Sequence, residues 1–217
     1  MVGKLIVIEA GDGSGKATQT KKLFERLQTE GQNVIKISFP DYESPSSSLV
    51  KMYLNGDFGT HADDVDAYAA STFYAVDRYA SYRMKWQSFY NAGNIILADR
   101  YTTSNMVHQA VKFTDDSVRD DFLNWLCDFE FNKLKLPQPD LVIFLDMPPE
   151  ISQRLIVKRN RKDIHENDFD YLRRCYVAYK NLAQKFKWIK INCSENNQPR
   201  AINSIHEEIF AAVKTIL

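Results

Sequence analysis

The sequence predicts one α/β domain, spanning residues 1–217, in which helices cover both faces of a five-stranded parallel sheet. Three observations favour this fold: five short apolar runs, helical patterns between them, and a glycine-rich turn directly after the first run. The expected strands are Lys4–Glu9, Asn33–Ser38, Asn94–Ala98, Leu141–Leu145 and Trp188–Asn192. Helices that alternate with strands are typical of parallel sheets.

The glycine-rich turn covers residues 10–18, between the first strand and a helix expected at Thr18–Glu30. A strand, a glycine loop, a lysine and a helix form the context of a phosphate-binding loop. Its glycines point backbone N–H groups at one spot, and Lys16 can reach the outer phosphates of a nucleoside triphosphate. Two residues depart from the usual pattern, because Ala10 replaces a glycine and Ala17 replaces the hydroxyl residue that binds Mg²⁺. A glycine-rich turn that only packs is the alternative.

Polar residues follow the strands at the edge where parallel sheets bind ligands. Asp99 and Arg100 close the third strand, beside the expected position of the phosphate loop. Asp99 can bind Mg²⁺ directly or through water, and Arg100 can neutralise a phosphate. An ion pair that caps the strand end is the alternative.

A long helical segment is expected over Asp63–Asn91, broken near its middle. Tyr74 and Arg78 lie one turn apart in it, so they could stack on a base and bond its edge, or form an ordinary surface pair. Ser104, Asn105 and His108 could contact a nucleoside or could be surface residues.

The segment from 157 to about 168 is dense in cations and lies between two helical runs. It could be a mobile lid whose arginines, Arg159 and Arg161, reach the transferred phosphate, or a solvated loop. The expected helices at Thr114–Lys135 and Pro199–Leu217 carry apolar residues that fit either the core or a subunit contact. A serine within Ser44–Ser48 is expected to cap the next helix.

Composition excludes several classes of protein. The formal net charge is zero, which argues against a protein that coats nucleic acid. No apolar run approaches the roughly 20 residues of a membrane span, and no signal peptide is visible. Cys127, Cys175 and Cys193 have no close pairing, so we expect reduced, mostly buried thiols in a cytoplasmic protein.

Taken together, these motifs resemble the thymidylate kinase family over almost the whole chain. The elements that carry the resemblance are Gly11-Asp12-Gly13-Ser14-Gly15-Lys16-x-Thr18-Gln19, Phe39-Pro40-x-Tyr42, Tyr74-x-x-Asp77-Arg78, Asp99-Arg100-Tyr101-x-x-Ser104-Asn105 and Pro139-Asp140-Leu141 through Glu150. The resemblance implies a P-loop NTPase-type three-layer αβα fold with a short helical lid. It also implies a homodimer that uses Mg²⁺ and transfers the γ-phosphate of ATP to dTMP, giving dTDP for dTTP biosynthesis.

The resemblance implies a role for each matching residue. The residues that would hold ATP are Gly11, Asp12, Gly13, Ser14, Gly15, Lys16, Ala17 and Thr18. The residues that would line the acceptor site are Asp12, Phe39, Tyr42, Tyr74, Arg78, Arg100, Ser104, Asn105 and His108. Asp12 would accept a hydrogen bond from the sugar 3′-hydroxyl, Tyr74 would stack on thymine and Arg78 would bond its edge. Lys16, Arg100 and a lid arginine, Arg159 or Arg161, would act on the transferred phosphate, and Asp99 and Glu166 would lie near the metal.

Several departures leave other functions open. Tyr74 stands where phenylalanine is usual, Asp41 leaves no arginine beside Phe39-Pro40, and His108 stands where others use tyrosine or a different group. These positions allow a kinase for another deoxynucleoside monophosphate or for a nucleoside. The loss of the hydroxyl at Ala17 allows a regulatory module that binds a nucleotide without catalysis. A P-loop ATPase that acts on a partner protein is a third alternative.

Overall fold

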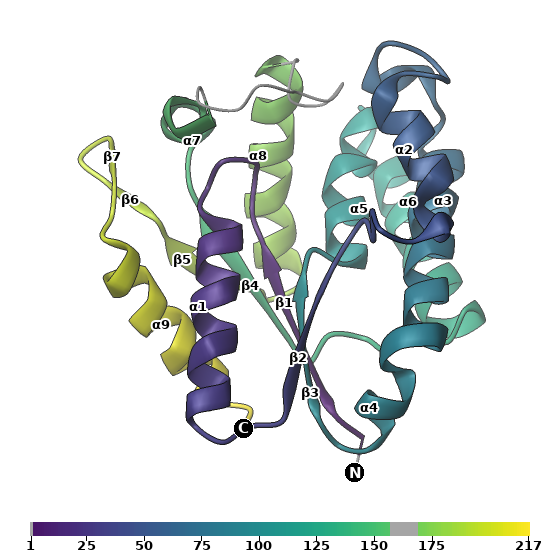
Figure 1. Ribbon diagram of the computed structural model, residues 1–217. Coiled ribbons are helices and arrows are strands. Elements are labelled where there is room, and N and C mark those ends of the chain that lie inside the picture. Colours follow the sequence, from purple (N-terminus) through teal and green to yellow (C-terminus); the bar gives the residue numbers. More distant parts are fainter. Residues whose placement is uncertain (1, 157–168) are drawn as a thin grey trace.

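The computed structural model describes residues 2–156 and 169–217 and contains the expected three-layer α/β fold (Figure 1). All five strands of the main sheet pair in parallel, in the order β2-β3-β1-β4-β5. The strands are β1 (Lys4–Glu9), β2 (Val34–Ser38), β3 (Ile95–Asp99), β4 (Leu141–Asp146) and β5 (Ile189–Asn192). Each expected strand is present, with its ends displaced by at most one residue, so the predicted fold class is confirmed.

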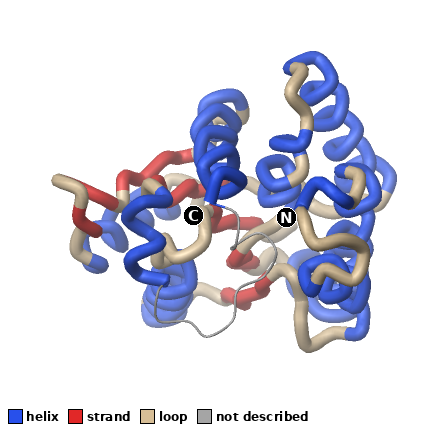
Figure 2. Tube along the Cα trace, turned by 90° about the horizontal axis from the view of Figure 1, so that it is seen from above, coloured by secondary structure: helices blue, strands red, loops and turns tan. Residues whose placement is uncertain are grey.

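Helices pack on both sides of this sheet (Figure 2). The helices are α1 (Lys16–Thr29), α2 (Ser48–Asn55), α3 (Ala67–Ser81), α4 (Gln87–Asn91), α5 (Thr102–His108), α6 (Asp116–Cys127), α7 (Pro149–Ile156), α8 (Phe169–Lys185) and α9 (Ile202–Lys214). Short 3₁₀ turns occupy η1 (Pro45–Ser47), η2 (Ala62–Asp64) and η4 (Ala110–Lys112). Two π-helical segments, η3 (Tyr82–Trp86) and η5 (Asp128–Lys133), follow α3 and α6.

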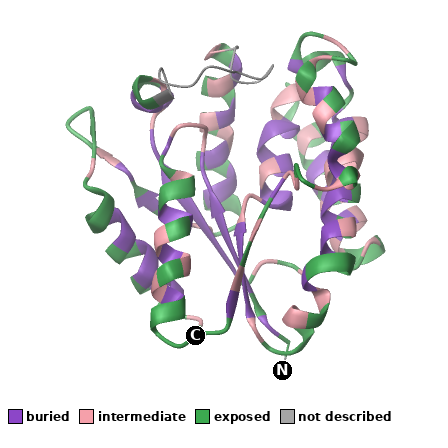
Figure 3. Ribbon diagram, in the orientation of Figure 1, coloured by how far each residue is buried: buried purple, intermediate pink, exposed green. Residues whose placement is uncertain are grey.

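Side chains alternate between the two faces of β1 and thereby divide the core. Ile6 and Ile8 pack toward α1 and α9, whereas Leu5 and Val7 pack on the opposite face with Trp86. The three central strands, β1, β3 and β4, are buried, whereas the edge strands β2 and β5 and the outer sides of α1 and α9 are partly exposed (Figure 3). By the same alternation, Glu9 at the end of β1 points away from α1, to the side where α5 and α8 lie.

Two long helical segments differ from expectation. The α-helix of the segment 63–91 begins only at Ala67, where the Asp66 carboxylate caps it by accepting from the backbone N–H groups of Tyr68 and Ala69 at 2.8 and 3.3 Å. The break near its middle is the π-helical segment η3. The segment 114–135 is likewise capped by Asp115 and ends in the π-helical segment η5.

Smaller features complete the comparison. Ser44 caps the 3₁₀ turn η1, which lies directly before α2. An unexpected hairpin, β6 (Ser194–Glu195) with β7 (Gln198–Pro199), turns through Asn196 and Asn197, both with positive φ. Cys127, Cys175 and Cys193 are free thiols. Of the described helices, none has the length and apolar character needed to cross a membrane.

Candidate active site

The loop between β1 and α1 is folded as a cradle. Gly13 and Gly15 have φ values of 72° and 83°, a region that glycine enters without steric cost, and Gly15 leads directly into α1. The Ser14 hydroxyl donates to the Gly11 carbonyl at 2.5 Å, which closes the loop. Ala10 is accommodated because its φ is not positive and its side chain is buried in the core.

A cavity of about 420 Å³ runs along this loop. It is lined by all the residues predicted to hold ATP, which are Gly11, Asp12, Gly13, Ser14, Gly15, Lys16, Ala17 and Thr18. The opposite wall comes from the segment around Pro199, Arg200 and Ile202, which sequence reasoning did not assign to the site. The start of α1 points its unpaired N–H groups toward this cavity, which favours an anion.

Asp99 and Arg100 point to opposite sides of the sheet, as successive residues at a strand end do. Asp99 forms an ion pair with Lys16 at the start of α1. Burial lowers the pKa of Lys16, the nearby Arg100 charge lowers it further, and the Asp99 carboxylate counteracts both. Asp99 therefore belongs to the phosphate-loop side of the site.

Arg100 faces the second side and has a positive φ of 68°, an uncommon conformation for a residue with a Cβ. Its guanidinium forms an ion pair with Asp12 and donates to the Ser104 hydroxyl and to His108 Nε2, both at 3.4 Å. Because arginine only donates, Nε2 of His108 must be the acceptor. Burial alone would lower the pKa of Arg100, but the surrounding negative groups, Asp12 foremost, hold it well above its usual value.

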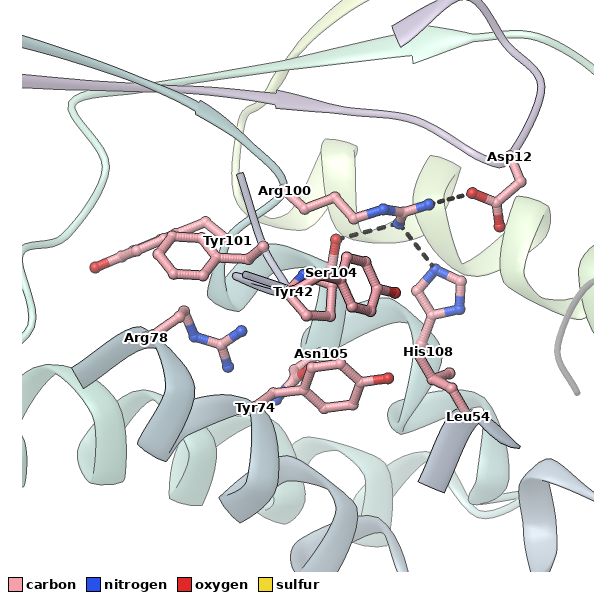
Figure 4. Close-up of a pocket in the computed structure, with 12 residues that line it drawn as sticks. Asp12, Tyr42, Leu54, Tyr74, Arg78, Arg100, Tyr101, Ser104, Asn105 and His108 are labelled. Atoms are coloured by element: carbon pink, nitrogen blue, oxygen red, sulfur yellow. Dashed lines mark hydrogen bonds and ion pairs between the residues drawn. The ribbon is translucent and has the colours of Figure 1, made fainter. Parts of the chain in front are cut away.

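A second cavity, of about 180 Å³, opens beside Arg100 (Figure 4). Its lining residues are Asp12, Phe39, Pro40, Tyr42, Leu54, Tyr74, Arg78, Arg100, Tyr101, Ser104, Asn105 and His108. The structure thus brings together every residue predicted to line the acceptor site. Tyr74 and Arg78 extend from α3 on one side, and Arg100 and Asp12 face each other on the other side (Figure 4). Leu54 is a lining residue that sequence reasoning missed.

Asp12 borders both cavities, so the phosphate cradle and the second cavity share a wall. The same residue holds Arg100 in place through the ion pair. A group bound in the second cavity would therefore lie next to the end of the phosphate loop.

The carboxylate of Glu9 is fully buried and accepts a hydrogen bond from Ser104, which lines the second cavity. It accepts from the hydroxyls of Thr103 at 2.5 Å, Ser104 at 2.9 Å and Tyr179 at 3.2 Å, and from the backbone N–H of Tyr101 at 3.3 Å. It therefore links β1 to α5 and α8. Sequence reasoning did not assign Glu9 a role, although an acidic residue ending an apolar strand is a signal of one.

Three predicted residues, Arg159, Arg161 and Glu166, lie outside the described residues, as does the predicted lid at 157–168. Within the described part of the chain, no group of three or more His, Cys, Asp or Glu side chains could hold a metal ion. A single carboxylate such as Asp99 still fits Mg²⁺, because this ion keeps several waters and is completed by substrate phosphates. Ala17 supplies no hydroxyl to it.

Comparisons with known proteins agree with this geometry. The family described as "Thymidylate kinase" matches residues 8–209. A probable thymidylate kinase of Thermococcus kodakarensis is 29% identical over 216 residues, covering 98% of both chains. The thymidylate kinase of Mycobacterium tuberculosis is 29% identical over 186 residues, covering 82% of this chain and 85% of its own. A solved structure of the Candida albicans thymidylate kinase has the same fold, with a TM-score of 0.73 at 23% identity, covering 99% of this chain and 92% of its own. The chain therefore belongs to the thymidylate kinase family, as its motifs predict, and is an ATP-dependent nucleoside monophosphate kinase.

Proposed function

We propose that this chain transfers the γ-phosphoryl group of ATP to dTMP, giving dTDP, with ATP along the phosphate loop and dTMP in the cavity beside Arg100. The observation that carries the proposal is the wall shared at Asp12. A cradle for a triphosphate and a cavity lined by a phosphate-binding arginine meet there. Transfer of a phosphoryl group between two bound nucleotides needs this adjacency, because the attacking and leaving oxygens must lie in line.

In this reaction an oxygen of the dTMP phosphate attacks the γ-phosphorus of ATP, and the bond from that phosphorus to the β-phosphate oxygen breaks. Arg100 holds the acceptor phosphate, since its guanidinium is partly buried, permanently charged and paired with Asp12 at the junction of the cavities. Lys16 neutralises charge on the donor phosphates once they compete with Asp99 for its ammonium. No covalent enzyme intermediate is needed, because positioning and charge neutralisation supply the rate.

The other end of the cavity suits a pyrimidine. Tyr74 offers a ring for stacking, and its neighbour one turn on, Arg78, offers N–H donors to the base edge (Figure 4). Asp12 is placed to accept from the 3′-hydroxyl of the sugar. Ser104, Asn105 and His108 complete the wall from α5.

Mg²⁺ is the cofactor that fits this site. Asp99 would hold it together with the ATP phosphates, and the ion would add positive charge where the transferred group develops negative charge. Glu166 is proposed as a second acidic group near the ion, and Arg159 or Arg161 as the lid arginine.

We also propose a cytoplasmic homodimer. Exposed apolar side chains on neighbouring helices support a contact between two copies: Leu49 and Met52 on α2, and Val76 and Tyr79 on α3. Sedimentation velocity tests it, since a species of twice the chain mass is expected and a monomer at micromolar concentration would refute it.

A coupled ADP-release assay with ATP and Mg²⁺ tests the function. It compares dTMP with dUMP, dCMP, dGMP, UMP and thymidine, and we expect a strong preference for dTMP. In the variant Lys16→Ala turnover should fall by about 10³-fold or more. Preference for another monophosphate would keep the mechanism but change the substrate, and near-native turnover of Lys16→Ala would overturn the assignment of the phosphate loop.

A further inference from the structure

The guanidinium of Arg78 pairs with a second fully buried carboxylate, that of Glu130. Arg78 Nε donates to Glu130 Oε2 at 2.7 Å, and Nη2 donates to Oε1 at 2.5 Å, so the two planar groups meet in a bidentate pair. The side chains are 1% and 0% exposed. Burial alone would lower the pKa of Arg78, but the Glu130 carboxylate holds it above its usual value, so the guanidinium stays charged.

Glu130 is itself held in place from two directions. The Thr102 hydroxyl, at the first residue of α5, donates to Oε2 at 2.7 Å. The backbone of Glu130 lies in the π-helical segment η5, and its carbonyl accepts from the Leu136 N–H at 3.0 Å. Segments of this kind are frequent at functional sites. Here Glu130 points inward from a helix that otherwise contributes apolar groups to the core.

The pair determines what Arg78 can offer to a ligand. Two of its five N–H groups are used by Glu130, which leaves those of Nη1 and one of Nη2 for the cavity that Arg78 lines. Figure 4 shows the guanidinium pointing from α3 toward the space bordered by Tyr42 and Asn105. The carboxylate also cancels the positive charge, so the pair presents donors without a net charge. Such a group suits a neutral carbonyl oxygen, whereas the phosphate is served by Arg100.

We propose that Glu130 is a positioning residue for base selection: it fixes Arg78 so that the free N–H donors meet the 4-carbonyl of thymine. The inference rests on the proposed function. Cytosine carries an amino group at this position, which would place donor against donor and leave both unpaired in a buried site. An arginine without a fixed orientation could turn away from that amino group, so discrimination requires Glu130 as well as Arg78.

The test is Glu130→Gln, which keeps the size of the side chain and removes its charge. We expect the KM for dTMP to rise by about tenfold or more, since one misaligned hydrogen bond in a buried site has this effect. The ratio of kcat/KM for dTMP to that for dCMP should fall by a similar factor. The KM for ATP and the kcat at saturating dTMP should change little, because Lys16 and Arg100 are untouched. A role in stability alone would lower Tm but leave the selectivity ratio unchanged.

The matched control is Glu207→Gln, the same chemical change in an exposed pair with Arg26 on α9 and α1. If Glu130→Gln does not fold, Thr102→Val removes only the hydroxyl that steadies Oε2 and should shift the ratio in the same direction by a smaller factor. A folded variant with the parent selectivity refutes the role of Glu130. Absence of dTMP-dependent turnover in the parent would refute the proposed function instead, so the two failures are distinguishable.

Discussion

Replacing Glu9 by glutamine should destabilise the protein strongly, although the two side chains have nearly the same shape. The carboxylate is fully buried and accepts from four donors on α5, α8 and the turn before α5. Glutamine retains one acceptor oxygen and brings an NH₂ group to the other position. One donor, the Tyr179 hydroxyl, then loses this partner and keeps two weaker ones, the Ala10 carbonyl at 3.3 Å and His108 Nε2 at 3.5 Å.

The magnitude follows from these contacts. One hydrogen bond to a charged group is lost, worth about 1.5–3 kcal/mol, and the remaining three become neutral and lose about 1 kcal/mol each. A neutral amide is easier to bury than a carboxylate, which offsets part of this loss. We therefore expect the free energy of unfolding to fall by about 2–4 kcal/mol. For a domain of this size that lowers Tm by about 4–16 °C.

Thermal unfolding followed by circular dichroism or calorimetry measures the effect. The matched control is Glu25→Gln, which removes an exposed carboxylate 3.8 Å from Lys21 on α1 and should change stability by less than about 1 kcal/mol. A Glu9→Gln variant whose Tm lies within about 2 °C of the parent would refute the reasoning. It would mean that the hydroxyls around Glu9 find other acceptors at no cost.

Two further predictions concern the metal and the pH dependence. Ala17→Ser restores the hydroxyl next to Lys16, so the Mg²⁺ concentration for half-maximal activity should fall, on the order of tenfold; an unchanged Mg²⁺ titration would contradict this. Lys112 is partly buried, which lowers its pKa from 10.5 to about 8. Its charge therefore destabilises the folded state below about pH 8, and the free energy of unfolding should rise as the pH rises from about 8 toward 10.5. The Tm of the parent should therefore rise relative to that of Lys112→Met between pH 7 and pH 10, and parallel curves would rule this out.

Much of the site could be predicted because its determinants are local in the sequence. The phosphate loop needs only a strand, closely spaced glycines and a lysine, and the Asp99-Arg100 turn needs only the end of an apolar strand. Tyr74 and Arg78 share a helical face by their spacing alone. The family, the fold class, the enzyme class and the thymidylate kinase function predicted from these motifs are confirmed.

The supporting carboxylates could not be predicted in the same way. Glu9 bonds to Thr103, 94 positions along the chain, and Glu130 bonds to Arg78, 52 positions away. No local sequence pattern reveals either pairing, since each depends on how the helices pack on the sheet. The π-helical segment that carries Glu130 is equally hidden, because its apolar spacing reads as a continuation of α6. The roles of the individual site residues stay predictions, and Arg159, Arg161 and Glu166 also lie outside the described residues.

In the proposed function, the two arginines of the cavity beside Arg100 bind two different kinds of ligand. Arg78 is buried and Arg100 is partly buried, and both have a carboxylate partner, but the partners differ in accessibility. Glu130 is fully buried and bidentate, so it stays with Arg78 and the pair meets a neutral base. Asp12 keeps a quarter of its side chain exposed, at the junction of the two cavities. A phosphate can therefore compete with Asp12 for Arg100, and the displaced carboxylate is then available to a sugar hydroxyl. The difference in burial of the two carboxylates thus supports the proposed roles, in which Arg78 binds the base and Arg100 binds the phosphate.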